Sequence, residues 1–217
     1  MKDYYKQRIA HYYKIEKYGN VDIRESFFGG RTNNLTFNYE CDPKSTQSIK
    51  YLDFTSLYPY VLSTKEYPIG HPRVITEFNN NNIENYFGFI KCKVLPPKSL
   101  YLPILPIRLI KSKKLVFPLC ATCAEEMNQS NCKHSAEERM LVGTWTSMEL
   151  KQAVKRGYLI KEILEILHYE EKRCDIFFEY IKTWLKVKTE ASGRPPNCQT
   201  DDGINEFIDQ FYEREGK

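Results

Sequence analysis

The stretch from Cys120 to His134 contains almost no large apolar residue, which limits how this part of the chain can fold. A segment of this kind cannot be ordered by burial in a core, so another source of folding energy is needed. It carries two ligand pairs, Cys120-Ala121-Thr122-Cys123 and Cys132-Lys133-His134, separated by eight residues. Three thiolates and one imidazole suit a tetrahedral structural zinc ion, whose binding can fold a small module. We therefore predict a structural zinc knuckle at Cys120, Cys123, Cys132 and His134, with ordinary reduced cysteines in a loop as the alternative.

The cysteine count is odd, at seven. The N-terminus lacks the apolar stretch of a secretory signal peptide, and no apolar run approaches the roughly 20 residues that cross a bilayer. These features favour reduced thiols over disulfides and predict an intracellular protein, with nucleus and mitochondrion both compatible. The four cysteines outside the cluster are expected to be packing residues: Cys41, Cys92, Cys174 and Cys198.

Composition indicates a folded chain with a weakly basic balance. The chain has 217 residues with 41% apolar content, enough for one large domain or two small ones. Its 32 Lys and Arg against 28 Asp and Glu leave a net charge of +4. This charge permits a phosphate-bearing partner without requiring one.

Hydrophobic periodicity predicts mixed helices and strands. Gly157 is a natural end for one of the helices, and Thr146-Ser147-Met148-Glu149 has the spacing of a capping box at its start. The prolines between Pro96 and Pro106 predict an extended, irregular segment as far as Leu115. The expected helices are 4–18, 147–156, 175–191 and 204–215, and the expected strands are 35–39, 49–52, 89–94 and 159–168. The pattern of 159–168 is also compatible with a helix, and its short length after Gly157-Tyr158 favours the strand.

Asp53 follows the predicted strand 49–52 and precedes a predicted turn. A carboxylate in that position can hold a divalent ion together with the carbonyl oxygen of the next residue, and magnesium prefers such oxygen ligands. An aspartate after a strand is more often a helix cap or a turn residue, and that alternative stays open on composition alone. The paired Gly29-Gly30 also has two interpretations: a plain turn, or a point where a ligand approaches the backbone closely.

Lysines on the predicted helix 175–191 form a third candidate site. Lys182, Lys186 and Lys188, with Arg194 beyond them, could contact a DNA backbone. A solvated helix face is the alternative, because three cations at mixed spacing are common on exposed helices.

The segment Asp53-Phe54-Thr55-Ser56-Leu57-Tyr58-Pro59 resembles motif A of family B DNA polymerases. Gly29-Gly30 is similar to the Tyr-x-Gly-Gly element of the protein-primed branch, with Phe27 in place of the tyrosine. Leu95-Pro96-Pro97, Phe117-Pro118-Leu119-Cys120 and Gly143-Thr144-Trp145, with Glu190-Ala191-Ser192-Gly193, further resemble polymerases of the Maverick/Polinton transposon and organellar or viral group. The resemblance covers nearly the whole chain.

This resemblance implies an α+β fold, in which a partial polymerase palm of antiparallel strands is followed by a helical and irregular insertion carrying the zinc knuckle. It implies three consecutive parts. Residues 1–70 hold the first palm portion, 71–146 the insertion with the Pro-rich stretch and the Cys/His cluster, and 147–217 the helical part leading towards the absent fingers.

Specific roles follow from the same resemblance. Asp53 would be the catalytic carboxylate that binds two magnesium ions, with the Phe54 carbonyl as a second ligand. The backbone from Phe54 through Thr55 and Ser56 to Leu57 would lie near the nucleoside triphosphate, and the Tyr58 ring would exclude a ribose 2′-hydroxyl. Phe27, Gly29, Gly30 and Arg31 would contact DNA, although Phe27 lacks the hydroxyl of the family's tyrosine. DNA primer-template, deoxynucleoside triphosphates and a terminal priming protein are the implied partners.

Two elements of the family's active site are missing from the sequence: the Asp-Thr-Asp element with the second metal-binding acid, and the finger helix. Asp201-Asp202 is the nearest acidic pair but comes too early in the family order. We therefore expect a fragment of a DNA-directed DNA polymerase that is catalytically incomplete alone. The alternatives are a non-enzymatic, zinc-stabilised nucleic-acid-binding module and a transposon remnant without function.

Overall fold

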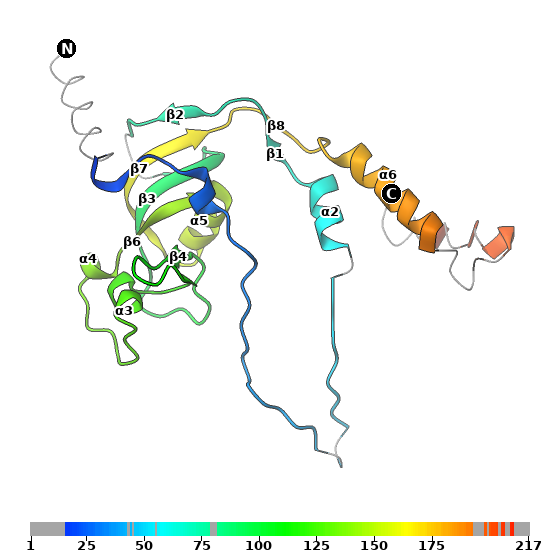
Figure 1. The fold of residues 1–217 in the computed structure, drawn as a ribbon, viewed down its shortest axis with the longest axis horizontal. Helices are drawn as coiled ribbons and strands as arrows, with labels where there is room; N and C mark the ends of the chain where they lie inside the picture. The colour runs from blue at the N-terminus through cyan, green and yellow to red at the C-terminus, as the bar shows by residue number, and fades with distance from the viewer. Residues whose placement is uncertain are drawn as a thin grey trace. The chain divides into compact units, whose positions relative to one another are not determined.

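The computed structural model describes residues 16–42, 44, 46–54, 56–78, 82–192, 198, 200–203, 205–206 and 209–210. The chain forms two compact units, whose residues can be found in Figure 1 by the colour bar. Unit 1 is Met1–Glu40 with Pro68–Lys172, and unit 2 is Cys41–Tyr67 with Arg173–Lys217. The units are interleaved along the chain, whereas the sequence-based division had three consecutive parts. Among the described residues, no helix has the length and apolar character needed to cross a membrane.

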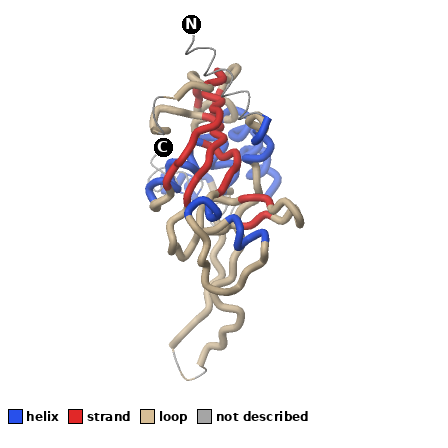
Figure 2. Tube along the Cα trace, turned by 90° about the vertical axis from the view of Figure 1, so that its left-hand side faces the viewer, coloured by secondary structure: helices blue, strands red, loops and turns tan. Residues whose placement is uncertain are grey.

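Unit 1 is built on a four-stranded antiparallel sheet. Its strands are among those coloured red in Figure 2. Its strands are β2 (Arg73–Ile75), β3 (Gly88–Leu95), β6 (Leu141–Thr146) and β7 (Leu159–His168), in the order β2-β7-β3-β6. β3 and β7 confirm the strands predicted at 89–94 and 159–168. The described fold is therefore a mixture of helices and antiparallel sheet, as expected.

Short elements surround this sheet. The proline-rich residues 96–106 are irregular, as predicted. The prediction is wrong for the residues up to Leu115, because β4 (Ile107–Arg108) pairs with β5 (Leu115–Val116) in a hairpin. α3 (Ala121–Glu125) lies within the predicted zinc segment, and α4 (Ala136–Arg139) follows it. The 3-10 helix η1 (Ile23–Ser26) packs on β6. The short strands β1 (Tyr67–Pro68) and β8 (Lys172–Arg173) pair with each other, and the chain passes from one unit to the other within them.

α5 (Ser147–Lys155) forms where the capping signal predicted it. The Thr146 hydroxyl accepts the Glu149 N–H, and the Glu149 carboxylate accepts the Thr146 N–H at 3.2 Å, which completes the capping box. The chain then leaves the helix through Gly157, whose φ of +89° is a left-handed conformation that favours glycine.

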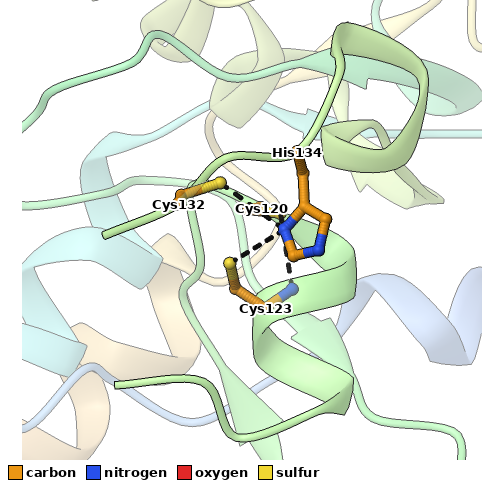
Figure 3. Close-up of side chains that lie close together, drawn as sticks. All are labelled: Cys120, Cys123, Cys132 and His134. Carbon is orange, nitrogen blue, oxygen red and sulfur yellow. Dashed lines mark hydrogen bonds between the residues drawn. The ribbon is translucent and has the colours of Figure 1, made fainter. Parts of the chain in front are cut away.

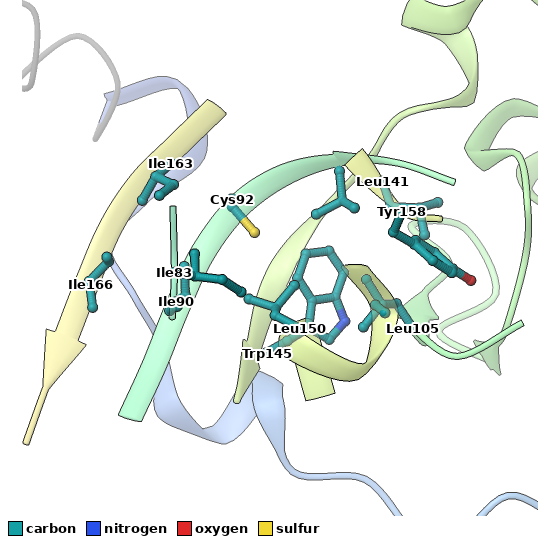
Figure 4. Close-up of a cluster of buried hydrophobic side chains, with 12 residues drawn as sticks. Ile83, Ile90, Cys92, Leu105, Leu141, Trp145, Leu150, Tyr158, Ile163 and Ile166 are labelled. Carbon is teal, nitrogen blue, oxygen red and sulfur yellow. The ribbon is translucent and has the colours of Figure 1, made fainter. Parts of the chain in front are cut away.

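The core lies between one sheet face and α5 (Figure 4). Ile90, Cys92 and Val94 alternate along β3 and are fully buried. Trp145 lies opposite Ile90 in the β3–β6 register, and its indole N–H donates to the Pro106 carbonyl at 2.9 Å. Burial raises the pKa of the Cys92 thiol far above its ordinary value, so this thiol acts as an apolar packing group.

The opposite face of β3 carries a buried lysine, which is covered by the chain around η1. Lys91 is 5% exposed and has Thr144 and Glu165 opposite it on the two neighbouring strands. The Lys91 ammonium donates to the Asn20 carbonyl at 2.9 Å and lies 3.8 Å from the Glu25 carboxylate. Glu165 accepts the Val21 N–H at 2.6 Å. These bonds fix residues 20–25 across the sheet, just ahead of Phe27 and the paired glycines.

Unit 2 contains α2 (Leu57–Thr64) and α6 (Phe178–Ser192), which contact each other. α6 confirms most of the helix predicted at 175–191. Its predicted apolar stripe is only partly covered, because Ile181 is 6% exposed while Trp184 is 57% exposed.

Two predicted palm strands are wrong. Residues 35–39 and 49–52 are not strands, and the described chain offers no neighbouring strand to pair with their backbone groups. Their alternating apolar side chains are exposed, with Phe37 96% and Tyr51 94% accessible. Alternation needs a partner strand and a core to become a sheet, so the antiparallel sheet forms from residues 73–168 instead.

Other predictions fall partly or wholly outside the described residues. Residues 16–18 are helical, but the remainder of the predicted helix 4–18 lies outside the described range, as do Ile204, Phe207, Ile208 and Phe211 of the last predicted helix. Cys92 and Cys198 are buried as predicted. Cys174 directly follows β8, is exposed and is not a packing residue.

Gly143 should be sensitive to a single added methyl group. A Cβ at Gly143 would lie 2.9 Å from the Trp145 ring, which is itself 1% exposed and cannot move into open space. We expect Gly143→Ala to lower the free energy of unfolding by about 1–3 kcal/mol in urea titrations. Gly29→Ala is the matched control, because a Cβ there meets nothing within 4 Å. Equal stability of both variants would contradict this packing.

Candidate functional site

Cys120 and Cys123 are brought together by one turn of helix. Cys120 is the N-cap of α3, and its sulfur accepts the Cys123 N–H at 3.4 Å. The Cys-x-x-Cys spacing therefore puts both sulfurs at the start of the same short helix. Such a helix, of five residues, is too short to be stable without tertiary support.

Cys132 and His134 come from the loop that leads into α4. A capping box of Ser135 and Glu138 fixes the start of α4 immediately after His134. The Thr122 hydroxyl donates to the Glu138 carbonyl at 2.7 Å, which joins α3 to α4. The two halves of the cluster are thus attached to two helices that are bonded to each other.

The four ligand atoms converge on one point (Figure 3), as the sequence predicted. The Nδ1 atom of His134 lies 3.5 Å, 3.2 Å and 3.6 Å from the sulfurs of Cys120, Cys123 and Cys132. All four ligand atoms lie within 4.8 Å of one another. With ordinary zinc–sulfur and zinc–nitrogen bond lengths, a tetrahedral ion would separate sulfur from nitrogen by about 3.6 Å. The arrangement therefore fits a tetrahedral cation.

The electrostatics of the cluster also favour a cation. The pKa of Cys132 is lowered to about 7, mainly by a hydrogen bond from the backbone N–H of His134. Desolvation, and then the neighbouring thiols of Cys132 and Cys120, raise the pKa of Cys123 to about 12. Three thiolates this close together repel one another, and a divalent ion at their centre would remove that repulsion.

Two further residues border the cluster and were not predicted. Glu126 has a carboxylate oxygen 3.7 Å from Nε2 of His134, and the Asn128 amide donates to the Cys123 sulfur at 3.8 Å. A ligating histidine commonly directs its second nitrogen at a carboxylate, which fixes the ring and its tautomer. Their place in the sequence between the two ligand pairs could have suggested both residues.

The motif A segment belongs to unit 2. α2 starts at Leu57, and its N-cap is Ser56, whose φ of 59° is left-handed. The cap is therefore Ser56 and not Asp53, which removes the capping alternative for Asp53. Asp53, Phe54 and Tyr58 are exposed, and Thr55 lies outside the described residues. The expected buried strand before Asp53 is absent, as described above.

The first turn of α2 leaves backbone N–H groups unused. Ser56 makes no side-chain cap bond, and Pro59 has no N–H. The Tyr60 N–H is the first that bonds within the helix, to the Ser56 carbonyl at 3.0 Å. The N–H groups of Leu57 and Tyr58 have no acceptor within the helix, and they are available to an anion.

The Gly-Gly element lies in unit 1, after η1. Phe27 packs edge-on against Phe89 with ring centroids 5.7 Å apart. Gly29 and Gly30 have open space where a side chain would be, so no contact in the described fold requires glycine there. Arg31 donates to the Pro103 carbonyl and lies 4.9 Å over the Phe117 ring, which fixes its guanidinium beside the glycines.

The lysines of the third candidate site lie on α6. Lys182, Lys186 and Lys188 are exposed, and the Lys182 ammonium lies 5.9 Å from the Phe178 ring centre. Arg194 lies outside the described residues.

A family model for "DNA polymerase type B, organellar and viral" matches residues 1–200. The chain belongs to the organellar and viral type B DNA polymerases. A curated member of similar sequence, named "Probable DNA polymerase" in Neurospora intermedia, is 28% identical over 158 residues, covering 69% of this chain. This type B polymerase chain spans 14% of that relative's length.

Two solved structures are also similar. One is the orthorhombic crystal form of Phi29 DNA polymerase, with 20% identity and a TM-score of 0.41 over 62% of this chain. The other is Phi29 DNA polymerase complexed with primer-template DNA, with 21% identity and a TM-score of 0.39 over 64% of this chain. The matches cover 21% of each solved chain.

The left-handed conformation of Ser56 generates a prediction for unit 2. A β-branched side chain is strained at a φ of 59°, whereas glycine is not. We expect Ser56→Val to lower the stability of unit 2 by about 1–3 kcal/mol and Ser56→Gly to leave it nearly unchanged. Hydrogen exchange of the α2 amides measures this local stability. Equal exchange in the two variants would show that Ser56 does not adopt this conformation.

Proposed function

We propose that this chain supplies the motif A portion of a DNA-directed DNA polymerase, which adds nucleotides to a primer 3′ hydroxyl under the direction of a template. The family match over residues 1–200 carries this proposal, since Asp53 to Pro59 lies within it and has the form of motif A. DNA primer-template and deoxynucleoside triphosphates are the proposed substrates, and a terminal priming protein is a proposed partner.

Asp53 and the Phe54 carbonyl are the oxygen ligands that we assign to magnesium. An exposed carboxylate followed by a main-chain oxygen suits a hard cation that keeps several waters and binds substrate phosphates. Two magnesium ions, when bound, would stabilise the attacking 3′ oxygen and the leaving pyrophosphate. The chain itself supplies the carboxylate that holds the metal and the turn that presents it.

The first turn of α2 is the proposed contact for the triphosphate. The unused N–H groups of Leu57 and Tyr58 can donate to phosphate oxygens, and the positive end of the helix dipole favours negative charge. The Tyr58 ring is 83% exposed and is assigned to the sugar, where it would exclude a 2′-hydroxyl. Phe54, Thr55 and Ser56 complete the proposed nucleotide-binding segment.

Gly29 and Gly30 are assigned to the DNA backbone. Their open surroundings let a phosphate approach the main chain closely, and Arg31 stands beside them with donors left over from its bond to Pro103. Phe27 contributes its ring alone, since it lacks a hydroxyl.

The chain is proposed to be catalytically incomplete by itself. One aspartate holds only part of a two-metal site, and the sequence contains neither the Asp-Thr-Asp element nor the finger motif of the family. Without the second carboxylate, the developing phosphate charge is not compensated.

Asp53 should decide whether a magnesium–nucleotide complex binds. We expect Asp53→Asn to abolish the magnesium-dependent part of dATP binding, measured by saturation-transfer NMR at the ligand resonances. Asp201→Asn is the matched control, because Asp201 is an exposed aspartate of unit 2 outside motif A. Loss of binding in the Asp201 variant, with Asp53→Asn unaffected, would contradict the assignment.

A primer-extension assay tests incompleteness separately. The purified chain should give no template-dependent product with magnesium and all four nucleotides, while a complete polymerase in the same buffer should. A product that disappears in Asp53→Ala would contradict the predicted incompleteness. DNA binding that ignores both nucleotide and Asp53 would favour the non-enzymatic module instead.

We also propose that Cys120, Cys123, Cys132 and His134 bind one structural zinc ion. The convergence of four suitable ligand atoms supports this assignment. The residues between them bury little apolar surface, so the ion would supply much of the energy that orders α3 and the following loop. Four protein ligands leave no open position for a substrate, which makes the ion structural.

Elemental analysis should find about one zinc per chain. Cys120→Ser and Cys132→Ser should each lose most of that zinc, because a hydroxyl is a poor substitute for a thiolate ligand. Cys174→Ser is the control, since Cys174 is exposed and stands outside the cluster. Folded, metal-free protein after purification without chelators would overturn the zinc assignment.

A further inference from the structure

Positive charge is concentrated around the Cys/His cluster. Residues 98–134 contain six Lys and Arg against two Glu, a formal net charge of +4, which equals the net charge of the whole chain. Three of these cations, Lys111, Lys113 and Lys114, lie in the loop of the β4–β5 hairpin and are exposed. Among the described residues, none of these three ammonium groups has an ion-pair partner. The hairpin loop is thus a compact source of unneutralised charge.

The backbone of this loop is held in place despite its exposure. Leu109 is 3% exposed and anchors the loop to the interior. Its carbonyl accepts the Lys113 N–H at 3.0 Å, and its own N–H donates to the Lys114 carbonyl at 2.9 Å. Lys113 takes a left-handed φ of 58°, so the chain reverses sharply with lysines on it. The three lysines therefore stand on a fixed turn.

One hydrogen bond joins this turn to the helix that carries part of the Cys/His cluster. The Ile110 N–H donates to the Glu125 carboxylate at 2.5 Å, and Glu125 is the last residue of α3, two positions after Cys123. Because α3 has only five residues, its position depends on tertiary contacts, which include those of Cys120 and Cys123 in the cluster and the bond from Thr122 to α4. The position of the lysine loop is therefore coupled to the order of the cluster.

We propose that the hairpin loop of Lys111, Lys113 and Lys114 binds the phosphate backbone of duplex DNA, and that the Cys/His cluster holds this loop in position through Glu125. The proposal rests on the proposed function for its DNA partner and its zinc ion. Unpaired lysines on a fixed loop suit phosphate groups, which are contacted without base specificity. The ion would act on DNA binding indirectly, by reducing the ordering that the loop must undergo on binding.

Charge neutralisation is the first test. The probe is a short fluorescein-labelled duplex DNA, with zinc-loaded full chain titrated in at several salt concentrations and binding read by anisotropy. We expect Lys111→Gln/Lys114→Gln to weaken binding roughly tenfold and to reduce the slope of log K against log salt by about 2. Lys155→Gln/Arg156→Gln is the control, because it removes two exposed cations of unit 1 at the end of α5. An equal loss in both double variants would overturn the proposal.

Glu125→Ala is the sharper test, because the proposed positioning of the loop by Glu125 and a simple effect of net charge predict opposite changes in DNA affinity. Removing an acidic group near the lysines should strengthen DNA binding if only net charge matters. If Glu125 positions the loop, the variant should bind about threefold to tenfold more weakly, with the salt slope unchanged. Glu137→Ala removes one exposed acidic charge from α4 and serves as the matched control. Unchanged or tighter binding by Glu125→Ala would overturn the coupling.

Zinc removal completes the test and separates it from the proposed function. Chelation should weaken DNA binding of the unaltered chain as Glu125→Ala does, and should have no further effect on that variant. Zinc content of Glu125→Ala must equal that of the unaltered chain, which excludes loss of the ion as the cause. Duplex DNA binding is measured here without magnesium or nucleotide, so failure of the motif A assignment leaves this result untouched. DNA binding that is indifferent to chelation would overturn the role of the cluster.

Discussion

Much of unit 1 is organised by the buried guanidinium of Arg139. This side chain donates to the carbonyls of Pro96, Pro97 and Leu119, at 2.9 Å, 2.7 Å and 3.3 Å. Pro96 and Pro97 lie where β3 ends, Leu119 directly precedes Cys120, and Arg139 closes α4 after His134. One cation thus ties the sheet to both ends of the Cys/His segment. These three carbonyls lie outside the helices and strands, and hydrogen bonds from a charged donor satisfy them strongly.

The sheet could be predicted where the sequence carries its own evidence. Alternation in β3 matches its burial, and the capping box and glycine that bound α5 are local signals that need no tertiary partner. Residues 35–39 carry the same alternation but no partner strand, and periodicity contains no information about pairing. The interleaving of two units could not be predicted for a related reason, since it depends on which segments meet after the chain returns.

The candidate sites divide along a similar line. Cys-x-x-Cys and Cys-x-His bring their own ligands close together by short spacing, so the cluster could be inferred before its geometry was known. Lys91, Glu25 and Glu165 meet across a large sequence separation, and nothing in the local sequence indicates that they fix the segment before the paired glycines. Glu125 is a comparable case, because its acceptor role towards Ile110 follows from the fold of the hairpin.

The two metal sites that we propose for this chain cannot exchange roles. Thiolates and imidazole are soft or borderline ligands that suit zinc, and four of them complete its coordination. Magnesium requires oxygen ligands and open positions for water and phosphate, which an exposed carboxylate such as Asp53 can offer. Under the proposed function, the Cys/His cluster therefore contributes by ordering the chain around it, while Asp53 offers the oxygen ligand to magnesium. One aspartate supplies only part of the ligands that two magnesium ions need, so in the proposed function Asp53 acts together with further carboxylates.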